Sequence, residues 1–418
     1  MIDLRRLRED PEYRRGIERK HVAEGHLDDL LAADQAVRDL RAGVDDLRAR
    51  QNVASKEIGR ASADERAAKI AAAATLKDEL KGLEAELVMA EERRRHLASS
   101  VPNPADTSVP DGGEDDGEEI RAVGGTPEAP RLDHAEFGEA MGWVDTEHAA
   151  EASGTRFAYL RGEAVLLELG LVNWVVQVLG ARGFSPVVPP VLVRERTMEE
   201  AGFFPTDRHQ VYELDDDDLF LVGTSEVPLS ALHRDEIVPV DDLPLRYAGI
   251  SSCFRREAGT YGKDTKGMFR LHQFDKVEMF SFAEPDSSWD ELDLILAIQE
   301  EIVGGLGLPY RVVNIAAGDL GAAAAKKFDL EVWLPSEGRY RELTSCSNYL
   351  DFSARRLGTR LRRDGGTVPL HTLNGTACAI GRTLVNLFEY CQQPDGSFVV
   401  PEVLRPFTGF ASVPAPPS

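Results

Sequence analysis

Much of the architecture of this chain can be worked out from one stretch, FRREAGTYGKDTKGMFRLHQFDKVEMF, which runs from Phe254 to Phe280. It follows the apolar segment RYAGI (246–250) and continues into DKVEMFSF, where apolar side chains alternate as they do in a strand. A polar, glycine-rich turn joins the two segments. The pattern predicts an antiparallel hairpin with Arg255 and Glu257 near one end and Phe274 on the returning strand.

A second stretch, NGTACAIGRTL (374–384), also places an arginine, Arg382, in a small-residue frame that is typical of a helix start. Guanidinium groups bind phosphate oxygens bidentately, carboxylates accept hydrogen bonds from amino groups, and aromatic faces stack on bases. Two fixed arginines therefore predict a polyphosphate site. From the residues alone, an ion pair between Arg255 and Glu257 with a core position for Phe274 fits equally well.

The composition is that of a globular enzyme. The chain has 418 residues, of which 42% are hydrophobic, enough for one large domain and a smaller one. Its net charge of −24 argues against a general nucleic-acid binder. Residues 27–99, however, carry 13 Lys and Arg against 15 Asp and Glu, so this segment is nearly neutral and could bind RNA through local patches.

Cysteine usage and the apolar runs indicate a cytoplasmic protein with no membrane segment. Neither zinc nor a disulfide is expected, because the cysteines show no CxxC spacing and no histidine pattern. They are Cys253, Cys346, Cys378 and Cys391. The start, MIDLRRLREDPEYRR, lacks the apolar region of a signal peptide. The apolar run from Ala164 to Ala181 contains Glu168, Asn173 and Gln177, which favours a core helix over a membrane span.

Apolar or small residues recur at alternating spacings of three and four in two segments. The first contains Leu30, Ala33, Val37, Leu40, Val44, Leu47, Gln51, Ala54 and Ile58, and the second contains Ala73, Leu76, Leu80, Leu83, Leu87, Ala90, Arg94 and Leu97. The seam is interrupted by GRASAD (59–64), where Ser62 could cap the second helix. The simplest prediction is an antiparallel helical hairpin about 50 Å long at 1.5 Å per residue. A dimerising coiled coil is the alternative.

Residues 101–130 are rich in Pro, Gly, Asp and Glu without a period, which predicts a linker. Beyond it we expect helices near 163–182, 289–303 and 382–392, and strands near Leu219, Leu245, Lys276, Tyr310, Phe328 and His371. Strands joined by hairpins and irregular loops favour an antiparallel α+β sheet. The chain contains neither GxGxxG nor GxxxxGK[ST], so the parallel-sheet nucleotide folds lose support.

These segments together resemble the class II aminoacyl-tRNA synthetases, and within that class the bacterial seryl-tRNA synthetases. FRREAG with HQFDKVE is similar to that family's second motif, NGTACAIGRTLV with VVPEVLRPF to its third, and GFSPVVPPVLV (183–193) to its first. GTSEVPL (223–229) and ELTSCSNYLDFSARR (342–356) match further family stretches. The resemblance covers almost the whole chain. It implies a tRNA-binding domain at 1–105 with a coiled-coil arm at about 27–99, a linker at 106–130, and a catalytic domain at 131–418 with an antiparallel sheet flanked by helices.

The resemblance implies an enzyme that joins serine to ATP as an adenylate, releases pyrophosphate, and transfers serine to the 3′ end of serine tRNA. The resemblance also allows selenocysteine tRNA as a second acceptor of serine. Such activation requires alignment and charge neutralisation. The implied catalytic residues are Arg255, which would contact the serine carboxylate and the α-phosphate, Arg382, which would contact the γ-phosphate, and Glu342. Glu342 and Ser345 would hold Mg²⁺ with phosphate oxygens, although a surface carboxylate is the alternative for Glu342. The implied ATP-binding residues are Arg255, Arg256, Glu257, Leu271, Phe274, Glu342, Leu343, Thr344, Ser345 and Arg382.

Recognition of serine requires buried polar partners for a single hydroxyl. The resemblance implies that Glu278 and Thr376 contact this hydroxyl and that Asn374 supports them. It also implies that Glu226 and Thr224, with Ser225 between them, hold the α-amino group. For Glu278, a strand carboxylate that faces solvent is the alternative. The sequence departs from the family's usual residues at Ser225, Thr376 and Cys378, where alanine, serine and a larger apolar residue are common.

The turn of the hairpin contains Tyr261, Lys263 and Lys266. These side chains could follow ATP or an incoming acceptor end, and a solvated turn is equally consistent with them, so we do not count them as catalytic.

We expect a homodimer formed through residues 183–193, with L-serine, ATP and serine tRNA as partners and the arm contacting the tRNA. One alternative is a duplicate or related serine-activating ligase that supplies antibiotic resistance, a biosynthetic pathway or a non-tRNA acceptor. The other is a catalytically inactive coiled-coil binding protein. The long arm argues against a non-tRNA acceptor, and the presence of Arg255, Glu257, Glu342 and Arg382 argues against loss of activity.

Overall fold

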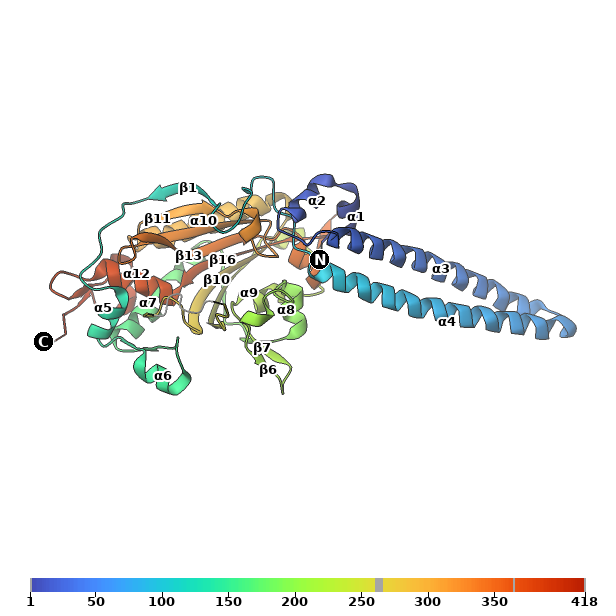
Figure 1. Cartoon of the computed structure of the whole chain (residues 1–418), viewed down its shortest axis with the longest axis horizontal. Coiled ribbons are helices and arrows are strands. Elements are labelled where there is room, and N and C mark those ends of the chain that lie inside the picture. Colours follow the sequence, from blue (N-terminus) through green and yellow to red (C-terminus); the bar gives the residue numbers. More distant parts are fainter. Residues whose placement is uncertain (1, 260–265, 364, 417–418) are drawn as a thin grey trace. The chain divides into compact units, whose positions relative to one another are not determined.

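The computed structural model describes residues 2–259, 266–363 and 365–416, which form two compact units with a boundary between Pro102 and Asn103. The first unit is helical. Its helices are α1 (Leu4–Glu9), α2 (Pro11–Glu18), α3 (His26–Arg60) and α4 (Ala63–Ser99). Ion pairs of Arg48 with Glu84 at 2.8 Å and Lys69 with Glu57 at 3.4 Å show that α3 and α4 run antiparallel. The predicted helical hairpin is therefore confirmed, and Figure 1 shows its two helices side by side.

A buried aspartate lies in the seam between α3 and α4. Asp34 is only 4% exposed and is surrounded by three guanidinium groups, those of Arg8 at 2.5 Å, Arg94 at 3.2 Å and Arg38 at 3.4 Å. This explains why Arg94 occupies a seam position in the heptad pattern, since its partner is a carboxylate on the facing helix. A single buried polar pair of this kind can fix the register of two helices.

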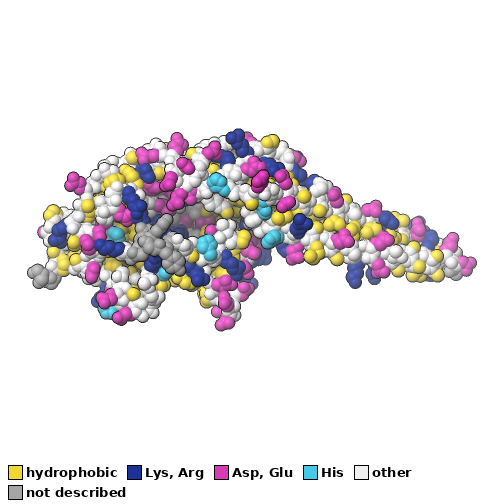
Figure 2. Space-filling model, in the orientation of Figure 1, with side chains coloured by type: hydrophobic (Ala, Val, Ile, Leu, Met, Phe, Trp, Pro, Cys, Tyr) yellow, Lys and Arg dark blue, Asp and Glu magenta, His cyan; other side chains and the backbone are white. Residues whose placement is uncertain are grey.

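The turn between the two arm helices differs in one detail from the prediction. Ser62 is at the N-cap position of α4, but its Oγ donates to Glu65 Oε2 at 3.1 Å and accepts no hydrogen bond from the helix backbone. Along the arm, Figure 2 shows basic and acidic side chains scattered among hydrophobic ones, as expected from the near balance of charges in this segment.

The second unit is built on an eight-stranded sheet. In spatial order its strands are β1 (Glu118–Val123), β11 (Tyr310–Asn314), β12 (Lys326–Leu334), β13 (Arg339–Asn348), β16 (His371–Ala379), β10 (Gln273–Ala283), β9 (Leu245–Phe254) and β4 (Ser185–Val187). All neighbouring pairs are antiparallel except β4 with β9, which is parallel. The predicted α+β class and the predicted β9–β10 hairpin are confirmed.

Strand β1 lies within residues 106–130, where the sequence predicts a linker. It pairs with β11 along the edge of the sheet, and all six of its residues are exposed. The sequence EEIRAV therefore has no buried face, and without burial there is no apolar alternation to reveal a strand. The predicted linker therefore contains a strand that its sequence does not reveal.

Helices α7 (Glu163–Ala181), α10 (Ser288–Gly305) and α12 (Ile380–Cys391) pack against the sheet and contribute to the main core. Among the described helices, α7 alone has the length and apolar composition to cross a membrane. Its residues Leu167, Leu171, Val175 and Leu179 are completely buried in that core. This packing agrees with the prediction of a core helix.

Smaller elements surround the sheet. The helices are α5 (His134–Ala140), α6 (Glu147–Ser153), α8 (Glu195–Ala201), α9 (Glu226–Ser230), α11 (Phe352–Leu357) and α13 (Arg405–Thr408). The strands form pairs or triplets: β2 (Val144–Asp145) with β3 (Tyr159–Leu160), β5 (Leu192–Arg194) with β7 (Leu219–Leu221) and β6 (Glu213–Leu214), β15 (Gly366–Pro369) with β14 (Arg360–Arg363) and β8 (Ile237–Pro239), and β17 (Phe398–Val399) with β18 (Ser412–Val413).

Candidate active site

A cavity of about 310 Å³ lies on one face of the large sheet. Strand β10 shows how the sequence creates this face, because successive side chains of a strand point to opposite sides. Val277 and Met279 belong to the main core, whereas Phe274, Lys276 and Glu278 line the cavity. The alternative of a solvent-facing Glu278 is wrong, since this residue is fully buried.

Most of the predicted site residues meet in this one cavity. Those that line it are Thr224, Glu226, Arg255, Glu257, Leu271, Phe274, Glu278, Glu342, Leu343, Thr344, Ser345, Asn374, Thr376 and Arg382. Two predicted residues do not line it. Ser225 is completely buried beside the cavity wall, and Arg256 is exposed with its guanidinium 6.0 Å from the ring of Tyr212.

Two β-bulges bring polar side chains to the cavity. Between β12 and β13, Leu330 pairs with Thr344 and Glu331 with Glu342, so Leu343 is an extra residue. An extra residue reverses the alternation of faces, which lets Glu342 and Ser345 face the same side although they are three positions apart. A second bulge at Ala377 of β16 does the same for Thr376 and Ala379.

One end of the cavity is a network of buried carboxylates and their partners. Glu278 Oε2 lies 2.5 Å from Lys276 Nζ and accepts from Thr376 Oγ1 at 3.2 Å, while Lys276 Nζ also donates to Thr224 Oγ1 at 2.8 Å. Asn374 Nδ2 lies between the two glutamates, 2.9 Å from Glu226 Oε2 and 3.2 Å from Glu278 Oε1. This end can accept hydrogen bonds from a small hydroxyl or ammonium group.

Glu226, one of the two glutamates of this network, has a pKa well above that of an ordinary carboxyl group. Burial and the nearby Glu278 carboxylate raise its pKa to about 7, although a hydrogen bond from Tyr349 and the charges of Lys276 and Arg255 act in the opposite direction. Burial and the same contact raise the pKa of Tyr349 well above its ordinary value, so the phenol remains a donor. A bound ammonium would favour the ionised form of Glu226.

Arg255 lies between the two ends of the cavity. Its Nε donates to the carbonyl of Gly223 at 3.1 Å, and its guanidinium carbon is 5.3 Å from the centre of the Phe274 ring. Its charge acts on Glu226 at one end and on Glu342 at the other. The sequence pattern correctly placed Arg255, Glu257 and Phe274 together.

Glu257 already has a partner in the cavity wall. Its Oε2 accepts from Arg270 Nη1 at 2.7 Å, and its backbone φ of +48° is in the left-handed region. The sequence was equally consistent with an ion pair between Arg255 and Glu257. In the structure the partner of Glu257 in the ion pair is Arg270. Because Arg270 holds Glu257 at the cavity wall, its carboxylate has a fixed direction.

The other end of the cavity contains Glu342 and Arg382. Arg382 is the third residue of α12, as the sequence predicted for a helix start, and its Nη1 donates to the Glu342 carbonyl at 2.9 Å. The Glu342 side chain is 45% exposed, so the burial that opposes its ionisation is only partial, and the charges of Arg382, Lys327 and Arg255 outweigh it and lower its pKa to about 2. Glu342 is therefore an anion in a cationic surrounding.

Several cavity residues were missed by the sequence reasoning, among them the polar residues Lys276, Lys327 and Tyr349 and the hairpin residues Phe269 and Arg270. Lys276 was within reach, because it alternates with Phe274 and Glu278 on the same strand. Lys327 lies on the neighbouring strand β12, 3.1 Å from Asp329, and Tyr349 follows β13. No spacing in the sequence links these two residues to the others.

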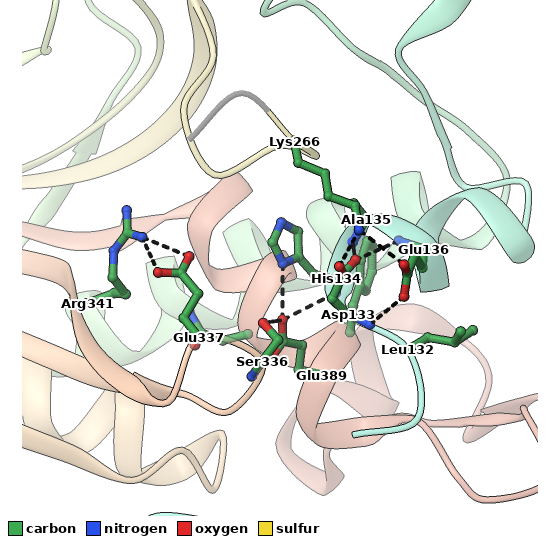
Figure 3. A network of polar contacts seen from close by, with 12 residues as sticks. Leu132, Asp133, His134, Ala135, Glu136, Lys266, Ser336, Glu337, Arg341 and Glu389 are labelled. Atoms are coloured by element: carbon green, nitrogen blue, oxygen red, sulfur yellow. Dashed lines mark hydrogen bonds and ion pairs between the residues drawn. The ribbon is translucent and has the colours of Figure 1, made fainter. Parts of the chain in front are cut away.

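The turn residues Tyr261 and Lys263 lie outside the described part of the chain. Lys266 is described, and it forms ion pairs with Asp133 and with Glu136 of α5, the latter at 3.1 Å (Figure 3). In this position it does not line the cavity.

The antiparallel sheet carries two arginines and a carboxylate in one cavity, an arrangement suited to the core of a class II aminoacyl-tRNA synthetase, and the family comparison identifies it as such a core. Residues 209–390 match the tRNA synthetase class II core domain (G, H, P, S and T), and residues 1–105 match the seryl-tRNA synthetase N-terminal domain. The chain belongs to the seryl-tRNA synthetase family.

Individual relatives agree along the entire chain. A serine–tRNA ligase of Thermobifida fusca is 50% identical over 415 residues, and one of Streptomyces coelicolor is 47% identical over 416, with 98% of both chains covered in each comparison. The crystal structure of seryl-tRNA synthetase from Pyrococcus horikoshii complexed with ATP matches with a TM-score of 0.94 at 36% identity and covers 100% of both chains.

Proposed function

We propose that the cavity is where this protein, a serine–tRNA ligase, activates serine with ATP. In the first step a serine carboxylate oxygen attacks the α-phosphorus, and the bond from that phosphorus to pyrophosphate breaks. In the second step the 3′-terminal hydroxyl of the tRNA attacks the carbonyl of the adenylate, and AMP leaves. The observation that carries this proposal is that Arg255 lies between a carboxylate-rich end and an arginine-rich end of one cavity.

The carboxylate-rich end suits serine. Glu226 and Thr224 would hold the α-ammonium group, and Glu278 with Thr376 would bind the hydroxyl, with Asn374 between the two glutamates. An analogue without the hydroxyl would leave Glu278 and Thr376 with an unmade hydrogen bond, which is how such a site rejects alanine. Asn374 Oδ1 is buried and has no partner in the described part of the chain, so it remains available to a ligand donor.

The other end suits ATP. Phe274 offers an aromatic face, Glu257 and the Leu271 segment line the same wall, and Arg382 would meet the terminal phosphates. Arg255 would neutralise charge on the α-phosphate and the attacking carboxylate together. We assign Arg256 and Ser225 no direct contact, because neither lines the cavity.

Glu342 and Ser345 fit a magnesium ion by the chemistry of their donors. Both offer oxygen atoms, the bulge turns both toward the cavity, and the low pKa of about 2 keeps Glu342 anionic. In the described ranges no group of three His, Cys, Asp or Glu side chains is placed to hold a metal ion by itself, so phosphate oxygens and water would supply the other ligands. When bound, the ion would neutralise phosphate charge.

Serine tRNA is the partner that we assign to the arm. Residues 1–105 match the seryl-tRNA synthetase N-terminal domain, and α3 and α4, of 35 and 37 residues, form a rod about 50 Å long. A rod of this length with both charge signs on its surface can contact an extended RNA feature through local basic patches. The match of residues 1–105 to this domain and the full-length relatives named serine–tRNA ligase disfavour the alternatives of a non-tRNA ligase and an inactive coiled-coil protein.

We also propose a homodimer through residues 183–193 and a cytoplasmic location. Strand β4 ends the large sheet, the adjacent Val188 is 81% exposed, and Leu169 of α7 is 60% exposed. An open sheet edge beside exposed apolar side chains is suited to pairing with a second copy. The cytoplasm supplies the ATP and tRNA that the reaction consumes.

The test is ATP–pyrophosphate exchange with each of the twenty amino acids, followed by charging of purified tRNA. We expect exchange that depends on serine and charging of serine tRNA. Exchange with another amino acid in preference to serine would refute the assignment of the cavity, and serine-dependent exchange without charging of any tRNA would point to a different acceptor.

A further inference from the structure

The guanidinium of Arg382 is held from two directions. Its Nη1 donates to the carbonyl of Glu342 at 2.9 Å, and its central carbon lies 4.9 Å from the centre of the Phe269 ring. Phe269 is 6% exposed and lines the cavity. The same Nη1 also lies 3.5 Å from Glu342 Oε2, so both polar contacts are made at one nitrogen. Contacts at one nitrogen leave the rest of the group able to rotate about it, whereas an aromatic face in contact with the guanidinium also restrains its plane.

The Phe269 ring is itself held by a second guanidinium. The central carbon of Arg341 is 3.9 Å from the ring centre, and Arg341 Nη1 lies 2.8 Å and 2.6 Å from the two carboxylate oxygens of Glu337 (Figure 3). Arg341 is not among the residues that line the cavity. The Glu337–Arg341 pair therefore fixes the ring, and the ring contacts the residue that faces the cavity.

Helix α12, which carries Arg382, is also anchored near its far end. Glu389 accepts from Ser336 Oγ at 2.6 Å and from the Ser336 backbone at 3.0 Å, and it lies 3.1 Å from His134 Nδ1 (Figure 3). Burial opposes ionisation of Glu389, but its hydrogen bonds from His134 and Ser336 lower its pKa, so it stays anionic. The helix backbone is thus fixed independently of Phe269, and the remaining freedom at Arg382 is in its side chain.

We propose that Phe269 is a positioning residue, which orients the Arg382 guanidinium toward the β- and γ-phosphates of ATP. The proposal rests on the proposed function, because it takes ATP as the ligand of this end of the cavity. Loss of the ring should weaken the binding of ATP but not that of AMP, since AMP has no phosphate beyond the α-phosphate. It should leave serine binding unchanged, since the residues that we assign to the serine ammonium and hydroxyl belong to β10, β16 and the segment 224–226, and none of them contacts Phe269 or Arg382 in the hydrogen-bond network.

The experiment compares Phe269→Leu, which keeps an apolar side chain but removes the aromatic face, with Phe269→Tyr, which keeps the face. Dissociation constants for ATP and AMP are measured by calorimetry on the full chain with Mg²⁺ and without serine or tRNA. We expect the preference for ATP over AMP to fall about 3-fold to 30-fold in Phe269→Leu, the range expected for loss of a partly desolvated cation–π contact. Phe269→Tyr should keep the parent preference.

A matched control is Tyr340→Leu, which removes a similar contact outside the cavity, that of Arg311 at 4.8 Å from the Tyr340 ring centre. It should leave both dissociation constants unchanged.

Equal weakening of ATP binding and AMP binding in Phe269→Leu would make Phe269 a purely structural residue and overturn the proposal. An unchanged preference for ATP over AMP would also overturn it. If the leucine variant is not folded, Phe269→Met, with a flexible side chain of similar volume, serves for the same comparison. If the parent binds ATP but shows no serine-dependent exchange, the proposed function fails and the role of Phe269 is still decided.

Discussion

The ammonium group of Lys276 lies 2.5 Å from Glu278 Oε2 at the floor of the cavity, and the two side chains are 7% and 1% exposed. A buried carboxylate is costly unless a cation and hydrogen bonds compensate it. Here Lys276 supplies the cation, and Thr376 and Asn374 supply the hydrogen bonds. Glu278 is therefore paired, buried and fixed in direction before a ligand arrives.

Lys276→Met should destabilise the protein by about 3–5 kcal/mol, because it leaves the Glu278 carboxylate buried without its cation. Urea unfolding of the parent and the variant measures this difference. The matched control is Lys266→Met, which removes an exposed ion pair with Asp133 and should have little effect. In the double variant Lys276→Met/Glu278→Leu much of the loss should be recovered, and a loss equal to that of the single variant would show that the ion pair is not its cause.

Arg255→Ala should abolish adenylate formation and leave the fold intact. The substitution removes the cation shared by the carboxylate and the α-phosphate, which should cost at least about 1.5–3 kcal/mol in the transition state. Serine-dependent pyrophosphate exchange is the measurement, with Arg311→Ala on β11, a residue that does not line the cavity, as the control. Exchange by Arg255→Ala within about threefold of the parent would contradict the assignment.

Glu278→Gln and Thr376→Ala should each raise the KM for serine more than the KM for ATP. Both residues are placed to contact the serine hydroxyl, and neither is near Arg382 in the hydrogen-bond network. The two KM values are measured on the same preparation, and Thr376→Ser, which keeps the hydroxyl, should behave like the parent. Equal changes in both KM values would remove these residues from the serine pocket.

The KM for serine should rise as the pH falls below about 7. Burial and Glu278 raise the pKa of Glu226 to about 7, so at lower pH the carboxyl is protonated and must lose a proton before it pairs with the serine ammonium. The rise should approach tenfold per pH unit well below this pKa. Exchange measured from about pH 6 to pH 8 tests it.

Glu226→Gln is the control for this pH dependence. It should raise the KM for serine at pH 8 and remove the pH dependence of that KM below 7, since glutamine does not titrate. A parent KM that is flat across the range would show that Glu226 does not hold the ammonium.

Deletion of residues 30–97, with a short Gly/Ser linker in their place, should preserve serine-dependent exchange and severely reduce charging of serine tRNA. Every cavity residue lies in the second compact unit, whereas the deleted segment lies wholly in the first. The binding of tRNA by the full chain should weaken with salt, and the truncated form should show a shallower slope. Near-parent kcat/KM for charging would contradict the role of the arm, and loss of exchange as well would show that the arm supports folding or dimerisation.

Local patterns were enough to predict the arm and the β9–β10 hairpin. The heptad spacing from Leu30 to Leu97 and the alternation in DKVEMFSF are properties of neighbouring residues, and periods of 3.5 and 2 follow from helix and strand geometry. The resemblance of the sequence motifs to those of the family then identified Arg255, Glu278 and Arg382, all of which line the cavity.

Local patterns could not predict three features of the structure. These are the bulges at Leu343 and Ala377, the edge strand β1, and the positions of Lys327 and Tyr349 in the cavity. A bulge depends on the register between two strands, and β1 exists because β11 offers a free edge, so neither leaves a period in its own segment. Lys327 and Tyr349 reach the cavity only because β12 and β13 lie next to each other in the sheet. Strand order and register are relationships between distant segments, and only the folded chain brings those segments together.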